Sequence, residues 1–137
     1  MNYLIHYTEK AQTALFQETG SFFAFSQKQF NEQSKQDVKY TSVGAGLICP
    51  SENVKKLLDG LEEINKKGVK LDVAENGPDA IIRREYFNYE TQISRDRSEA
   101  IEALESYREI YPDQFTDEKI KTVMDACWKE AIENDMF

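Results

Sequence analysis

Residues that build metal and thiol sites are scarce in this sequence. Its 137 residues include one histidine and two cysteines. With His6 alone and no Cys-x-x-Cys pair, a zinc site is not expected, and the Glu-x-x-His pairs of a di-metal helical bundle are missing. Cys49 and Cys127 lie far apart in apolar surroundings, so we interpret both as thiols that fill the core. We expect no metal and no cofactor.

Long apolar runs are also missing. No stretch approaches the roughly 18 apolar residues that span a bilayer, and His6, Glu9 and Lys10 interrupt the N-terminal windows where a secretory signal would be apolar. We therefore expect a cytoplasmic protein with no membrane partner. Apolar residues make up 40% and charged residues 31% of the chain. This composition and length predict a single globular domain over residues 1–137.

Basic residues are fewer than acidic residues, and this deficit is confined to the second half of the chain. Lys and Arg number 17 against 25 Asp and Glu, a net charge of −8. Residues 1–68 hold 8 basic and 8 acidic residues, whereas residues 69–137 hold 9 and 17, so the second half carries the whole excess. A negative field disfavours direct binding of nucleic acid. It favours a partner protein with a basic surface, although carboxylates that only keep a protein soluble would give the same composition.

Hydrophobic periodicity predicts an α-rich α+β fold, with about six helices and a small antiparallel sheet of two or three strands. On the helix that begins at Pro78, the apolar stripe places Arg83 and Arg84 on the outer side. The strands are expected over residues 38–43, 47–49 and 69–73. The helices are expected over residues 3–18, from Ser26 to about Gln33, from Ser51 to Gly68, from Pro78 through Ile93, from Asp96 or Ser98 to Pro112, and from Thr116 through Ile132.

The segment from Gly44 to Ser51 is the one candidate ligand loop, formed by Gly44, Gly46 and Ser51. A phosphate-binding loop needs its glycines directly before a helix, so that free N–H groups point at the anion. Here Leu47–Cys49 intervenes and no Gly-Lys-Ser/Thr follows, which favours a hairpin turn. A small ligand-binding domain or enzyme that uses this segment stays an alternative.

Catalytic groups do not combine into a recognisable constellation. The only thiol-and-base pairing joins His6 with Cys49 or Cys127, and nothing in the sequence brings them together. Adjacent carboxylates such as Glu102 and Glu105 fall on outward faces, where no burial would raise a pKa. We therefore expect a protein that is not an enzyme.

Four glutamates, Glu99, Glu102, Glu105 and Glu109, form the candidate partner-binding site and are called the acidic face below. The last three are spaced three and four residues apart and would line one side of a helix, with Glu99 one turn earlier. Like charges at this spacing repel by a few tenths of a kcal/mol per pair. A basic partner would relieve that repulsion.

Aromatic residues are dense between Ser21 and Phe30, where four phenylalanines occur in ten residues. Such a cluster is typical of a core, and an exposed cluster would mark a binding surface. Self-association of a homo-oligomeric structural protein is therefore a further alternative.

Three segments carry a resemblance: Phe23-Ala-Phe-Ser-Gln-Lys-Gln-Phe30, the glycine segment Gly44–Pro50, and Ala80-Ile-Ile-Arg-Arg-Glu-Tyr-Phe-Asn-Tyr-Glu90. Together they resemble a family of small proteins found in bacteriophages and mobile elements of bacteria. The resemblance covers about residues 21–125 and implies no assigned activity. Many members show Asn-His-Glu where this chain has Asn88-Tyr89-Glu90, so any chemistry of that histidine does not carry over.

What the resemblance implies is a phage or prophage context inside a bacterial host cell. Small acidic proteins in that context resemble inhibitors of host defence nucleases, which cover a nucleic-acid channel with negative charge. Our hypothesis is a small acidic non-enzymatic protein that binds a basic host protein such as a defence nuclease, as an anti-CRISPR-like inhibitor or nucleic-acid mimic.

Overall fold

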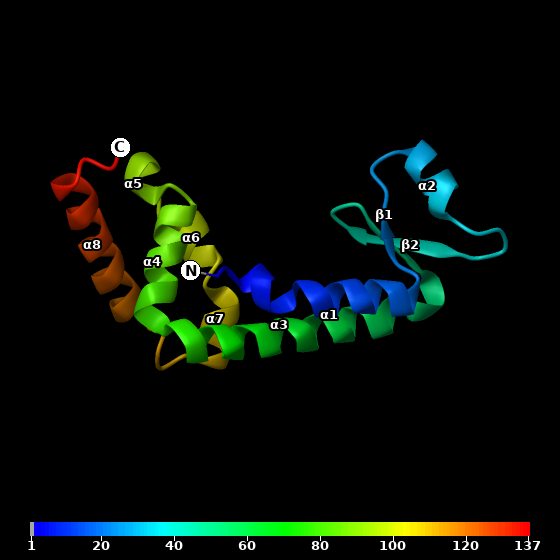
Figure 1. Ribbon diagram of the computed structural model, residues 1–137, viewed down its shortest axis with the longest axis horizontal. Coiled ribbons are helices and arrows are strands. Elements are labelled where there is room, and N and C mark those ends of the chain that lie inside the picture. The colour runs from blue at the N-terminus through cyan, green and yellow to red at the C-terminus, as the bar shows by residue number, and fades with distance from the viewer. Residues whose placement is uncertain (1) are drawn as a thin grey trace. The chain divides into compact units, whose positions relative to one another are not determined.

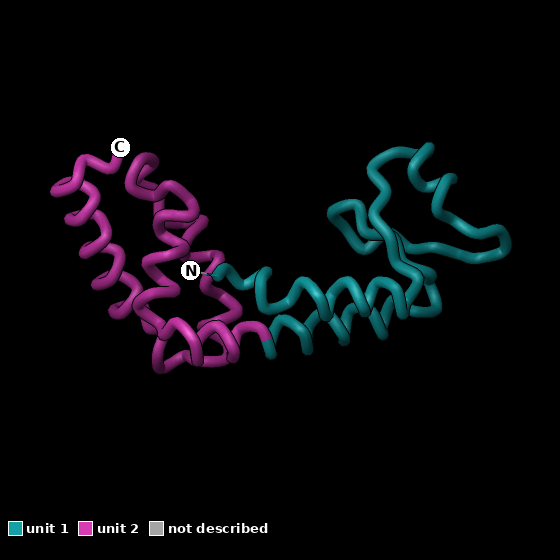
Figure 2. Tube along the Cα trace, in the orientation of Figure 1, with its two compact units in different colours: residues 1–67 teal, residues 68–137 magenta. Residues whose placement is uncertain are grey.

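The computed structural model describes residues 2–137, whose backbone forms eight α-helices and three short strands (Figure 1). The predicted class, α-rich α+β with a small antiparallel sheet, is confirmed. Contacts gather the chain into an N-terminal unit up to Lys67 and a C-terminal unit from Gly68 to Phe137 (Figure 2). The boundary falls inside one long helix, and the single domain inferred from chain length stays a prediction.

Local signals set the first helices of the N-terminal unit. Helix α1, Leu4–Thr19, ends as predicted at Gly20, whose φ of 75° is left-handed. Helix α2, Gln27–Gln33, begins after Ser26, whose hydroxyl accepts the Gln29 N–H at 3.2 Å. Both ends follow from residues that satisfy free backbone groups or tolerate positive φ.

The sheet has the strand order β1-β3-β2, with antiparallel pairing throughout. The predicted hairpin is confirmed as β2, Tyr40–Gly44, and β3, Leu47–Pro50. The third strand is β1, Phe22–Phe23, and residues 69–73, predicted as a strand, are helical. At the hairpin turn Gly46 has a φ of 79°.

Apolar residues from α1, β3 and α3 form the core of the N-terminal unit. Its buried members are Leu15, Leu47, Cys49 and Leu57. Gly60 of α3 lets α1 approach closely, because a Cβ there would lie 2.7 Å from a methyl carbon of Leu15. The clustered phenylalanines divide between two environments: Phe22 and Phe30 pack against Tyr40, whereas Phe23 and Phe25 are exposed.

Helix α3, Val54–Asn76, is longer than predicted and does not end at Gly68. A glycine inside a helix costs about 1 kcal/mol relative to alanine, which a long helix can absorb because propagation is easier than nucleation. The alternation at residues 69–73 was too short to decide between strand and helix. Val69 is fully buried and Leu71 is 55% exposed, because the two residues lie on different sides of the helix.

Five helices make up the rest of the C-terminal unit: α4, Pro78–Asn88; α5, Thr91–Ser94; α6, Ser98–Glu102; α7, Glu105–Ile110; and α8, Asp117–Glu133. The helix predicted from Pro78 through Ile93 stops at Asn88, since Glu90 has a φ of 50°. The helix predicted up to Pro112 is divided at Ala103–Leu104, where Leu104 N–H donates to Ile101 O, three residues back. Thr116 caps α8 as predicted, accepting the Lys119 N–H at 3.1 Å.

Candidate functional site

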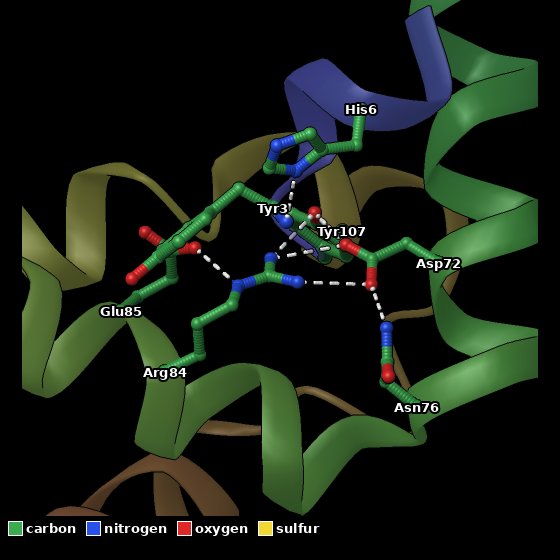
Figure 3. Close-up of polar contacts among 7 residues, drawn as sticks. All are labelled: Tyr3, His6, Asp72, Asn76, Arg84, Glu85 and Tyr107. Atoms are coloured by element: carbon green, nitrogen blue, oxygen red, sulfur yellow. Dashed lines mark hydrogen bonds and ion pairs between the residues drawn. The ribbon is translucent and has the colours of Figure 1, made fainter. Parts of the chain in front are cut away.

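The largest buried polar cluster of the C-terminal unit is centred on Asp72 of α3 (Figure 3). Its carboxylate accepts two hydrogen bonds from the Arg84 guanidinium, each 3.0 Å long. The Tyr107 hydroxyl donates to it at 2.5 Å and the Asn76 amide at 2.7 Å. Arg84 also donates to Glu85 at 2.8 Å. Three helices, α3, α4 and α7, are thereby joined through one carboxylate.

Arg84 lies inside this cluster, so its predicted outward position is wrong. Its side chain is 3% exposed and that of Asp72 is 0% exposed. Burial disfavours the charged guanidinium, but its hydrogen bonds with Asp72, Glu85 and Tyr107 outweigh burial and raise the pKa of Arg84. Burial and the hydrogen bond to Asp72 likewise raise the pKa of Tyr107. Arg84 therefore stays charged and Tyr107 stays protonated at neutral pH.

Sequence reasoning missed this cluster because Asp72 was assigned to a strand. Once α3 is extended, Asp72 follows the buried Gly68 and Val69 at helical spacing and takes an inward position. A carboxylate there requires a buried cation. Because Arg84, Tyr107 and Asn76 all donate to Asp72, we interpret the cluster as a brace between helices.

The brace fixes which way α7 faces. Tyr107 points inward and is 1% exposed. Residues two positions away on a helix lie about 200° around its axis, so Glu105 and Glu109 point to the opposite side. Both are exposed.

Helix α6 carries the other two members of the acidic face. Ala100 and Leu104 are fully buried, whereas Glu99 and Glu102 are exposed. Because the helix is interrupted at Ala103–Leu104, the acidic face lies on two consecutive helices and not on one, as the sequence had predicted.

Cations near the acidic face are engaged elsewhere. Arg108 lies between Glu105 and Glu109 in sequence, yet its guanidinium pairs with Asp117. Arg97 pairs with Asp125 at 2.9 Å. Among residues 2–137, no basic side chain forms an ion pair with any of the four glutamates. The acidic face thus presents carboxylates without compensating charge.

The structural boundary coincides with the charge boundary. Residue 68 is glycine, so the N-terminal unit up to Lys67 holds 8 basic and 8 acidic residues and the C-terminal unit holds 9 and 17. The negative charge is therefore a property of one compact unit.

The structure does not bring the three residues of the candidate ligand loop to one place. Gly44 and Gly46 lie at the β2–β3 turn, and Ser51 lies beyond the opposite end of β3. Ser51 shares a 2.7 Å hydrogen bond with Thr41 instead of capping an α-helix, and a 3-10 turn of residues 51–53 precedes α3. A pocket of about 390 Å³ next to Ser51 is lined by Asp37, Val38, Lys39, Ser51 and Glu52.

Histidine and cysteine occupy structural positions. His6 is exposed and its Nδ1 accepts the Tyr3 N–H at 2.8 Å at the start of α1. Cys49 and Cys127 are buried free thiols, and burial raises the pKa of Cys127. The described part of the chain has no cluster of three or more metal-ligating side chains.

Comparison with known proteins gives a family but no activity. A protein-family model for a family of unknown function, DUF7659, matches residues 4–130. No curated protein and no solved structure matches the chain. Over residues 2–137, none of the helices has both the length and the apolar character needed to cross a bilayer.

Proposed function

We propose that this chain, which belongs to the DUF7659 family of unknown function, is a small acidic interaction protein whose acidic face binds a basic surface on another protein. One observation carries the proposal: four exposed glutamates lie on the consecutive helices α6 and α7 and form no ion pair within residues 2–137, in the unit that holds all the excess negative charge.

Physical chemistry gives this arrangement a use in binding. Surface carboxylates close together repel and slightly weaken folding. An opposing basic surface relieves the repulsion and speeds the encounter by electrostatic attraction. The brace through Asp72 holds Tyr107 inward, so α7 presents Glu105 and Glu109 in a fixed direction. Less freedom is then lost when the partner binds.

The partner we propose is a nucleic-acid-binding protein of a bacterial host cell, such as a defence nuclease. Its basic channel would meet carboxylates in place of phosphates, and the protein would act in the cytoplasm as a competitive inhibitor without catalysis. The resemblance to small phage and mobile-element proteins supports this setting, and the net charge of −8 supports the kind of surface.

The test compares two variants with equal changes in charge. The face variant replaces all four glutamates of the acidic face by glutamine. The control variant replaces Glu9, Glu32, Glu52 and Glu63, which are exposed glutamates of the neutral N-terminal unit. Each tagged protein is mixed with host lysate at low salt and eluted at about 0.5 M salt, where the Debye length is below about 8 Å.

We expect a basic nucleic-acid-binding protein to elute from the wild type and the control variant, and to be lost from the face variant. Double-stranded DNA added as competitor should displace it. Equal retention by the face variant, or retention that DNA does not reduce, would refute the proposed face.

A further inference from the structure

A second surface of the C-terminal unit has the opposite chemistry. A pocket of about 260 Å³ opens between α4, α5, the segment that follows α5, and α8. Two of its lining residues are arginines and two are aromatic, in a unit whose net charge is −8. Its lining residues are Tyr86, Thr91, Arg95, Arg97 and Trp128.

Thr91 supplies a polar group without a partner. Its side chain is fully buried, and its Oγ1 has no hydrogen-bond partner among residues 2–137. A buried hydroxyl without a hydrogen bond is unfavourable in a protein interior. Thr91 lines the pocket, and a ligand group that reached its hydroxyl would give this hydroxyl the partner it lacks.

The two arginines supply positive charge at the same place. The Arg95 guanidinium lies over the Trp128 ring, 5.3 Å from its centre, and pairs with no carboxylate of the described chain. Its backbone has a φ of 63°, so the chain turns sharply where this residue is presented. Arg97 pairs with Asp125 at 2.9 Å, and Asp125 also accepts from Lys121 at 2.8 Å. Arg97 uses only its Nη2 in this pair, and a guanidinium has five N–H donors, so Arg97 retains donors for a further anion.

We propose that this pocket binds a small organic anion, a carboxylate or phosphate attached to one planar ring. The anionic group would accept charge-assisted hydrogen bonds from Arg95 and Arg97 and a hydrogen bond from the Thr91 hydroxyl. The ring would pack against Trp128 and Tyr86. The volume is slightly below the roughly 300 Å³ at which pockets for drug-sized ligands begin, which sets the limit of one ring. This inference concerns a different surface from the acidic face and stands without it.

The experiment uses Trp128, the only tryptophan of the sequence, as a reporter inside the pocket. The whole chain is titrated with phenyl phosphate and with benzoate while the fluorescence emission of Trp128 is followed. Isothermal titration calorimetry with the same two ligands detects binding that leaves the emission unchanged. Inorganic phosphate tests the anion without a ring, and benzamide tests the ring without a charge. Comparison of phenyl phosphate with benzoate shows whether the pocket prefers a phosphate or a carboxylate as the anionic group.

Two variants and one matched control decide the contacts. Arg95→Gln should weaken binding roughly tenfold or more, because it removes a charged donor. Thr91→Val should weaken binding several-fold and leave the urea midpoint of unfolding unchanged or higher, since the hydroxyl has no internal partner. The control is Arg83→Gln, which removes an arginine that lies over the Phe87 ring outside this pocket and should leave binding unchanged.

Saturable binding of phenyl phosphate or benzoate, lost in Arg95→Gln and kept in Arg83→Gln, would support the site. Absence of binding of both at about 10 mM, a concentration that would reveal even millimolar affinity, would overturn it. Equal binding of benzamide, or equal binding by Arg95→Gln, would overturn it as well.

Discussion

Asp72 receives four hydrogen bonds inside the C-terminal unit, so replacing its carboxylate by an amide of the same shape tests the brace directly. In Asp72→Asn the new NH₂ group must face Arg84 at either oxygen position, together with Asn76 at one and Tyr107 at the other. All three of these side chains donate toward the position they face. The Arg84 guanidinium would then keep Glu85 as an anionic partner.

The expected loss of stability follows from burial. Breaking a buried ion pair by removing one partner costs roughly 3–5 kcal/mol, because the other charge is left uncompensated. Glu85 compensates part of the charge on Arg84, so we expect the lower end, about 3 kcal/mol. This is a large fraction of the roughly 5–15 kcal/mol that stabilises a typical domain.

Urea unfolding followed by Trp128 emission reports on the C-terminal unit, and far-UV circular dichroism reports on all helices. The control is Asp79→Asn in the same unit, which removes an exposed ion pair with Lys119, 67% and 42% exposed. Exposed pairs contribute less than about 1 kcal/mol. If Asp72→Asn lost no more stability than this control, the cluster would not brace the helices and the reasoning would be refuted.

Two further predictions follow from the same structure. The raised pKa of Tyr107 stabilises the fold below about pH 10, the ordinary pKa of tyrosine, and this contribution is lost as the pH rises toward the folded-state pKa. The urea midpoint should fall above about pH 10, and less steeply in Tyr107→Phe; equal slopes would contradict this. Gly46→Ala should cost about 1–2 kcal/mol through its φ of 79°. Although the new Cβ would lie 2.3 Å from the Phe25 ring, that exposed ring can move, so Phe25→Ala should not restore thermal stability measured by circular dichroism.

Elements marked by local signals could be predicted from the sequence. Gly20 ends α1, Ser26 and Thr116 cap the helices that follow them, and the Gly44–Gly46 segment turns the hairpin. In each case a residue satisfies a free backbone group or tolerates positive φ, which depends only on its neighbours in the chain.

Features that depend on distant partners could not be predicted. Arg84 points inward because it donates hydrogen bonds to Asp72 of α3 and Tyr107 of α7. The residue pattern of α4 alone does not reveal these partners. The strand at residues 69–73 was predicted from alternating apolar and polar residues. In the structure this short segment is part of helix α3, where some of its residues are buried and others exposed. The interruption at Ala103–Leu104 has no proline or glycine to mark it, so the acidic face was assigned to one helix.

The candidate sites divide in the same way. The exposure of Glu99, Glu102, Glu105 and Glu109 could be predicted from helical periodicity. The absence of compensating cations could not, because the pairing of Arg108 with Asp117 joins α7 to α8. The pocket around Trp128 brings together residues from α4 to α8 and has no sequence signature.

The acidic face is tested most directly by the salt dependence of binding between the captured partner and three proteins: the wild type, the variant with glutamine at the four positions of the acidic face, and the matched variant of the N-terminal unit. We predict that the dissociation constant of the wild type and of the matched variant rises steeply with salt. The face variant should bind weakly, with a nearly flat dependence. The same affinity and the same salt dependence in all three proteins would contradict the account.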